Sequence, residues 1–149
     1  MTLTVRKRLE ALEGEVDGNL AVTSIAINGY GTWKIAAISL GATELGGVET
    51  NTSFSFPANG AIVLDAWIKV TDAETGTIDV GTQGTSNDPD GLLDGVSVAT
   101  LGYVGQVPAG KGALLNCFVT GADPVSVTSS GDLNSCEATL YISYLELPA

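Results

Sequence analysis

The residues best suited to chemistry in this sequence are three aspartates in one glycine-rich stretch. Asp88, Asp90 and Asp94 fall within SNDPDGLLDG, and alternate carboxylates beside a glycine can wrap a hard cation such as Ca²⁺. The spacing is not that of an EF-hand, and Asp-Pro and Asp-Gly are also common in ordinary turns. We therefore interpret the stretch as turn-forming, keep calcium as the alternative, and predict no resident metal or cofactor.

Other catalytic chemistries find little support. Histidine is absent from the 149 residues, which removes Ser-His-Asp and Cys-His nucleophiles and His-based metal sites. The glycine pairs Gly81/Gly84 and Gly102/Gly105 do not open a helix, so they do not form a phosphate-binding loop. Carboxylates are plentiful, but no pair stands out as the acid and base of a glycosidase. We expect a protein that is not an enzyme.

The two cysteines are too few for a disulfide framework. Cys117 and Cys136 lie in NCFVT and SCEAT, and neither has the CxxC spacing of a metal or redox site. We predict two small buried thiols, with a bridge between two strands as the alternative.

Six aromatic residues lie in or beside the expected strands. They could form a platform for stacking sugar rings, but aromatics at alternate strand positions more often belong to a core. They are Tyr30, Trp33, Trp67, Tyr103, Tyr141 and Tyr144.

The chain is strongly acidic, with a formal net charge of -11 from 6 basic and 17 acidic residues. Residues 35–149 contain Lys69 and Lys111 as their only basic residues, against 13 acidic ones. Because nucleic-acid binding depends on clustered Lys and Arg, we predict no nucleic-acid partner. No run approaches the roughly 18–20 apolar residues of a membrane span, and the basic N-terminus lacks the apolar stretch of a secretion signal.

The first segment, Thr2 to about Val16, has the periodicity of an amphipathic helix. Its apolar residues are spaced 4, 3 and 4 apart and form one stripe. So short a helix is marginal in water alone, so its stripe must be covered by its own chain or by a partner. We predict a docking arm that includes the stripe and the basic residues beside it: Val5, Arg6, Lys7, Arg8, Leu9, Leu12 and Val16.

After Gly18 the chain changes to short runs rich in Val, Ile, Thr and aromatics, separated by Gly, Asn, Asp and Pro. This pattern of short runs and turn residues is typical of an all-β sandwich or barrel. The stretch 81–112 is dense in Gly, Asp and Pro and is predicted to be a long loop, with only 96–100 as a short strand. The predicted strands are 22–28, 32–40, 52–56, 61–71, 77–82, 113–120, 125–129 and 138–147.

Several of these strands are apolar on both faces. In the strand 61–71, Ile62, Leu64 and Ala66 are predicted to face one way and Val63, Asp65 and Trp67 the other. An antiparallel sandwich normally wets one face of each sheet. Surplus apolar surface therefore predicts contacts between subunits, and we expect a homo-oligomer.

Residues 56–96 resemble a segment that recurs among structural proteins of tailed-bacteriophage particles. The matching pieces are Pro57–Gly60, Lys69–Gly76 and the stretch from Val80 through Leu93. Together they cover about 40 of the 149 residues, and they are turns and strand entries rather than site motifs.

The resemblance implies a jelly-roll-like antiparallel β-sandwich of about eight strands (21–149), with a short N-terminal α-helical arm (1–20). It also implies a homotrimeric decoration (cement) protein on the outer surface of a phage head, made in the host cytoplasm and bound to the major capsid protein. Such a protein has no catalytic site, no cofactor and no nucleic-acid or membrane partner. The alternative is a receptor- or glycan-binding fibre or tail module that uses the loop 81–112 and nearby aromatics.

Overall fold

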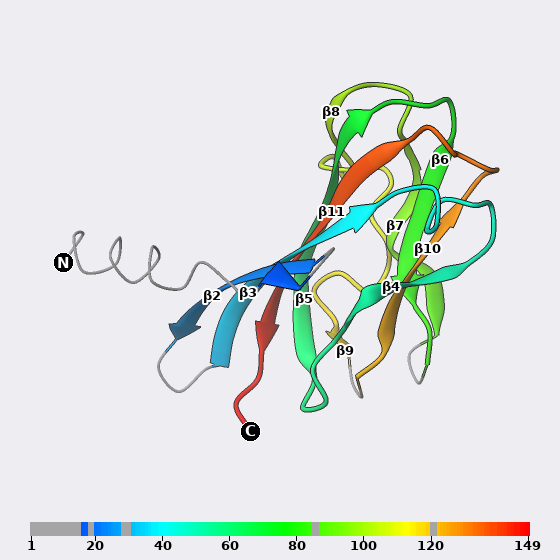
Figure 1. Cartoon of the computed structure of the whole chain (residues 1–149). Helices are drawn as coiled ribbons and strands as arrows, with labels where there is room; N and C mark the ends of the chain where they lie inside the picture. Colours follow the sequence, from blue (N-terminus) through cyan, green and yellow to red (C-terminus); the bar gives the residue numbers. More distant parts are fainter. Residues whose placement is uncertain (1–15, 18–19, 28–30, 85–86, 120–121) are drawn as a thin grey trace, which may run out of the picture.

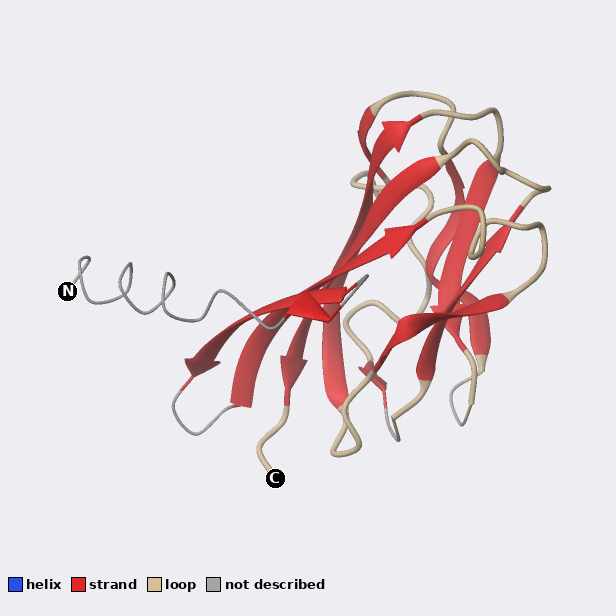
Figure 2. Ribbon diagram, in the orientation of Figure 1, coloured by secondary structure: helices blue, strands red, loops and turns tan. Residues whose placement is uncertain are grey.

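The computed structural model describes residues 16–17, 20–27, 31–84, 87–119 and 122–149. In this part of the chain the regular structure is entirely β, with eleven strands in two antiparallel sheets that pack face to face (Figures 1 and 2). The all-β prediction is confirmed, and the arrangement is that of a β-sandwich.

The larger sheet contains seven strands in the order β1-β2-β3-β11-β5-β8, with the short β9 also pairing with β5. Its strands are β1 (Val16–Asp17), β2 (Leu20–Ile27), β3 (Gly31–Leu40), β5 (Ala61–Asp72), β8 (Gly102–Val104), β9 (Phe118–Val119) and β11 (Glu137–Glu146).

The smaller sheet contains four strands in the order β4-β10-β6-β7. Its strands are β4 (Thr50–Ser55), β6 (Thr77–Thr82), β7 (Asp88–Ser97) and β10 (Pro124–Ser129).

The strand pairs are nested along the chain. From β3 onward the outermost strands pair first, β3 with β11, then β4 with β10, β5 with β8, and β6 with β7. The pairs β11–β5 and β10–β6 then join these hairpins side by side into the two sheets. All of these pairings are antiparallel. The chain from β3 to β11 therefore has the pairing of one long hairpin that is folded over to make the two sheets.

The core lies between the two sheets and is built from the inward side chains of both. Phe54 of β4 and Phe56, just after it, have ring centroids 5.3 Å apart and lie 5.5 and 5.8 Å from the ring centroid of Tyr144 in the larger sheet. Leu20 and Val22 of β2 pack against the edge of this core. Tyr144 is thereby a core residue, as its alternate strand position predicts.

Seven of the eight predicted strands are confirmed to within about two residues at each end. The eighth, 113–120, is wrong except for β9. Residues 113–117 instead turn, with the Cys117 amide donating to the Leu114 carbonyl at 3.1 Å and Asn116 at a φ of 62°. Their apolar residues Leu114 and Leu115 are used to cover the core from a loop rather than from a strand.

The predicted long loop 81–112 is also wrong, because it contains the ten-residue strand β7 and the short β8. Leu92, Leu93 and Val96 of β7 enter the core, and their burial outweighs the poor strand propensity of the surrounding Asp and Gly. Register shifts in the β6–β7 pair absorb the residues that break the alternation.

Strand β5 differs from its predicted facing because of a bulge. The register with β11 shifts between Val63 and Asp65, so that Val63 and Ala66 both face the core. Ile62 and Trp67 consequently share the outer face, whereas strict alternation would separate them. Leu64, at the bulge, is 42% exposed.

The predicted N-terminal helix lies mostly outside the described residues. Val16 is the one residue of its stripe that the structure describes, and its backbone is in β1, paired with Ala21 of β2, rather than in a helix. Val5, Arg6, Lys7, Arg8, Leu9 and Leu12 lie outside the described residues.

Candidate functional site

The outer face of the larger sheet carries a row of large apolar side chains that crosses five strands. The row follows the cross-strand register from β2 through β3, β11 and β5 to β9, so its members are direct neighbours on one face. It consists of Ile25, Trp33, Leu145, Ile62 and Phe118. Phe118, at the end of the row, is 49% exposed.

A second level of the same face holds an aromatic stack. Tyr141 of β11 lies opposite Trp67 of β5, with ring centroids 5.5 Å apart and an interplanar angle of 10°. Between the two levels, the indole Nε1 of Trp33 donates a hydrogen bond to Ser143 Oγ at 2.8 Å. This bond pairs the one polar atom of the Trp33 side chain with a hydroxyl group on the same face.

We call this surface the apolar face. It comprises the outward residues Ile25, Trp33, Ile35, Ala37, Ile62, Trp67, Phe118, Tyr141 and Leu145, and the polar residues Thr23, Ser143 and Asp65 occupy outward positions between its two levels. The prediction that the six aromatics belong to the core is confirmed for Tyr144 and wrong for Trp33, Trp67 and Tyr141, which lie on this face, and for the exposed Tyr103. Tyr30 lies outside the described residues.

The outer face of the smaller sheet has the opposite composition. Outward positions there alternate with the buried Phe54, Ile78, Val80, Val125 and Val127. They are small or polar: Asn51, Ser53, Ser55, Asp79, Ser97 and Thr128. Ser126, at another outward position, is buried and donates a hydrogen bond to the Glu49 carboxylate at 2.8 Å. The smaller sheet therefore has the polar, solvent-facing outer side that is usual for an antiparallel sandwich, and the larger sheet does not.

Charge is scarce on the apolar face. Asp65 is the carboxylate at its outward positions, and it forms an ion pair with Lys111 Nζ at 2.5 Å. The same ammonium donates to the Ala66 carbonyl at 2.5 Å, at the edge of β5 between its pairings with β8 and β9. Lys69, at the border, lies 5.6 Å from the centroid of the Tyr103 ring.

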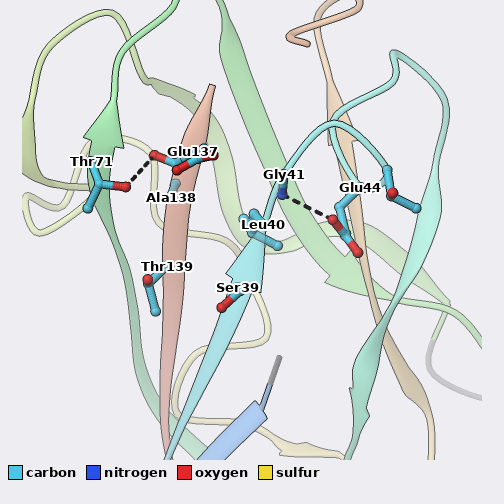
Figure 3. A pocket seen from close by; sticks show the side chains of 9 residues that line it. Ser39, Leu40, Gly41, Glu44, Thr71, Glu137, Ala138 and Thr139 are labelled. Carbon is cyan, nitrogen blue, oxygen red and sulfur yellow. Dashed lines mark hydrogen bonds between the residues drawn. The ribbon is translucent and has the colours of Figure 1, made fainter. Parts of the chain in front are cut away.

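The opposite end of the same sheet face is polar and forms a groove of about 420 Å³ (Figure 3). Its lining includes the hydroxyl side chains of Ser39, Thr71 and Thr139 and the acidic residues Glu44 and Glu137. The Glu44 carboxylate accepts a hydrogen bond from the Gly41 amide at 3.0 Å, and the Thr71 hydroxyl donates to the Glu137 carbonyl at 3.1 Å. The face therefore changes along the strands from apolar to polar and acidic.

The three aspartates considered for calcium all lie on β7 and not in a turn. Burial and the neighbouring Asp90 carboxylate raise the pKa of Asp88 above its ordinary value, whereas Asp94 is exposed further along the strand. Among the described residues, no group of three carboxylates or thiols is close enough to hold a metal ion. The turn interpretation is wrong for these positions, and the calcium alternative gains no support.

The glycines of this region have a packing role. A Cβ on Gly81 would lie 1.8 Å from the Asp88 carbonyl oxygen, so the close approach of β6 to β7 requires glycine there.

The two cysteines are free thiols in different environments. Cys136 is buried, as predicted, and burial together with the Glu74 and Asp72 carboxylates raises its pKa. Cys117 is exposed, so the prediction of two buried thiols is wrong for this residue. Its thiol donates weakly to the Ala113 carbonyl at 3.3 Å.

Comparisons with known proteins find structural likeness but no matching family. No protein-family model and no curated protein matches the chain. Among solved structures, a chain of the cyanophage Pam1 capsid asymmetric unit aligns with a TM-score of 0.47 at 18% identity, covering 90% of each chain. Within the described residues, no helix has the length and apolarity needed to cross a bilayer.

Proposed function

We propose that this protein is a structural component of a phage particle, most specifically a homotrimeric decoration protein that binds the outer surface of the head and bridges capsomers. The single observation that carries the proposal is that the outer face of the smaller sheet is polar whereas that of the larger sheet is largely apolar. A sandwich with one polar outer face and one apolar outer face is built to contact other protein over a wide area. The resemblance of residues 56–96 to phage structural proteins supplies the type of assembly.

The topology supports this class of protein. We infer that the nested pairs β3–β11, β4–β10, β5–β8 and β6–β7 form a jelly roll, the eight-strand double-sheet fold of viral capsid and lectin domains. Strands β1 and β2 extend the larger sheet beyond these eight strands. The segment that resembles phage proteins corresponds to β5, β6, β7 and their turns, including the tight turn in which the Gly60 amide donates to the Pro57 carbonyl at 2.8 Å.

The mechanism would be mechanical. A standard interface buries about 1,600 Å² in total, and apolar burial contributes about 25 cal/mol per Å² before the costs of association. Repeated over a capsid lattice, even a modest net gain per site resists outward pressure from packaged DNA. The predicted arm, with Arg6, Lys7 and Arg8, would contact acidic surface on the capsid.

The test is stoichiometric. We expect purified particles that contain this protein to hold it at a copy number tied to the capsid lattice, measured by gel densitometry against the major capsid protein. Mild denaturation should release it and leave heads that rebind the purified protein. A few copies per particle, confined to tails, would contradict the decoration role.

A glycan-binding role is the second candidate, and the position of Tyr103 favours it. This side chain is 55% exposed and borders a groove of about 460 Å³ that Val96, Val107 and Gly110 also line. Aromatic rings beside a groove can stack on sugars. A glycan array that gives specific binding, lost in Tyr103→Ala, would support this candidate.

A further inference from the structure

The apolar face is the feature that the proposed function leaves without a named partner. Capsid protein, the N-terminal segment of the same chain and a second copy of the chain are the three possible occupants. The charge distribution favours a second copy over the N-terminal segment, and the measurements of self-association below test a second copy against capsid protein.

Two copies of this chain repel one another over most of their surface. Each copy carries a net charge of -11, and the smaller sheet presents Asp79 on its outer face. The groove end of the larger sheet presents Glu44 and Glu137. Approach of two such surfaces is unfavourable, because like charges brought together in partly desolvated contacts cost free energy.

The apolar face escapes this repulsion. Its outward positions include one carboxylate, Asp65, and the neighbouring Lys111 ammonium neutralises it. Lys69, at the border, adds a positive charge. A second copy can therefore approach here without bringing carboxylates against carboxylates, whereas the arm's basic residues would gain nothing from this neutral surface.

The size of the face fits the centre of an interface between copies. Five strands at a spacing of about 4.8 Å give a width of about 19 Å. The four residue-to-residue steps from Tyr141 to Leu145 add about 13 Å along the strands. Stable interfaces have an apolar and aromatic centre of this kind within a polar rim, and Trp and Tyr are enriched in it. The polar groove residues Ser39 and Thr139 supply such a rim at one end.

We propose that the apolar face is the contact between copies of this chain, turned toward the common axis of the oligomer, with the row from Ile25 to Phe118 at its centre. The proposal deepens the proposed function by assigning the self-association to one face. It rests on the proposed function for one point, the phage particle in which the oligomer acts.

The first experiment uses the wild-type full chain. Both tryptophans of the sequence, Trp33 and Trp67, lie on the apolar face, so intrinsic fluorescence reports on its environment. We expect dilution to shift the emission to longer wavelength and to increase acrylamide quenching over the same concentration range in which sedimentation equilibrium shows the mass falling to 15.2 kDa. Dissociation with unchanged emission and quenching would overturn the proposal, and so would a monomer at all concentrations.

The second experiment uses matched arginine variants. Leu145→Arg places a charge at the centre of the row, and Ser53→Arg places the same charge at an outward strand position of the smaller sheet. We expect Leu145→Arg to weaken self-association by about 30-fold or more, as for a central interface residue, while Ser53→Arg retains the wild-type mass. If Leu145→Arg fails to fold by circular dichroism, the fluorescence result decides.

The outcomes separate this inference from the proposed function. A Leu145→Arg variant that keeps the wild-type mass and still binds particles overturns the assignment of the face and leaves the particle role intact. If Leu145→Arg is monomeric but the wild-type oligomer binds no particle, the apolar face is the contact between copies and the particle role is contradicted. If a chain lacking residues 1–15 has more strongly quenched tryptophans at the same oligomeric mass, the arm is the occupant and the proposal fails.

Discussion

At the scale of single residues, the ionised carboxyl group of Asp88 lowers the free energy of unfolding. Its pKa is raised by burial first and by Asp90 second, so the folded protein binds a proton at this site more tightly than the unfolded chain. The charged form therefore lowers stability above the folded-state pKa. That cost disappears as the pH falls below 3.8, the ordinary value.

We expect Asp88→Asn to raise the melting temperature at pH 7 and to have no such effect near pH 3. Differential scanning calorimetry of the variant and the wild type at both pH values checks this. A variant less stable than wild type at pH 7 would show that the Asp88 carboxylate is instead stabilised by the fold.

The two thiols allow a second residue-scale prediction. Cys117 is exposed and Cys136 is buried beside carboxylates that raise its pKa, and the thiolate is the reactive form. In the native protein, we expect an aromatic disulfide reagent to label one thiol quickly and the second only after unfolding. Cys117→Ser should abolish the fast phase, and a fast phase that persists in this variant would contradict the assignment.

At the scale of elements, the contact between β6 and β7 depends on Gly81. A side chain there would meet the backbone of Asp88 and Pro89, and neither strand can move without disturbing the core. We expect Gly81→Ala to lower the free energy of unfolding by about 1–3 kcal/mol, as for other overpacked sites. Gly131→Ala is the matched control, because a Cβ at that position has no neighbour within 4 Å. Equal urea midpoints for the two variants would contradict this account.

The N-terminal arm gives the second element-scale prediction. The buried core begins at Ala36, and Leu20 is the first residue that packs against it among those described. We expect deletion of residues 1–15 to change the melting temperature by less than about 2 °C while abolishing binding to undecorated capsids. Leu9→Asp should have the same effect on binding. A deletion variant that is insoluble or unfolded would show that the arm covers the protein's own core.

At the scale of the whole molecule, the large negative charge and the apolar face act against each other in assembly. Raising the ionic strength from about 0.01 M to about 0.15 M shortens the screening length from about 30 Å to about 8 Å. Repulsion between copies with a charge of -11 weakens, and the apolar contact is preserved. We therefore expect self-association to tighten with added sodium chloride, measured by sedimentation velocity. Association that weakens with salt would point to an interface made of ion pairs.

Much of the fold could be predicted from local patterns. Residues such as Val22, Ile78 and Val127 alternate with polar ones, and period-two alternation bounded by turn residues is itself the physical requirement for a strand with one buried face. The two-sided apolar character of β11 also predicted surplus surface correctly, because Tyr141 and Leu145 occupy the outer face while Leu140 and Ile142 enter the core.

The candidate site was only partly predictable. Composition showed that apolar surface was in excess, but not which residues would share it. Ile25, Trp33, Leu145, Ile62 and Phe118 come from five strands spread over most of the chain, and only the pairing register makes them neighbours. The one local signal for this face was the spacing of Tyr141 and Leu145, which lie four positions apart on one strand and therefore on the same side of it.

The sequence by itself determined the all-β class, most of the strands, the acidity and the surplus of apolar side chains, because these depend on residue type and on neighbours a few positions away. Only the tertiary structure decided the rest. Burial of Leu92 and Leu93 made a strand out of a stretch rich in Asp and Gly, and the bulge at Leu64 and Asp65 turned Ile62 and Trp67 to one side. Such choices depend on contacts between distant segments, and a one-residue shift in register reverses the facing of a strand without changing its local pattern.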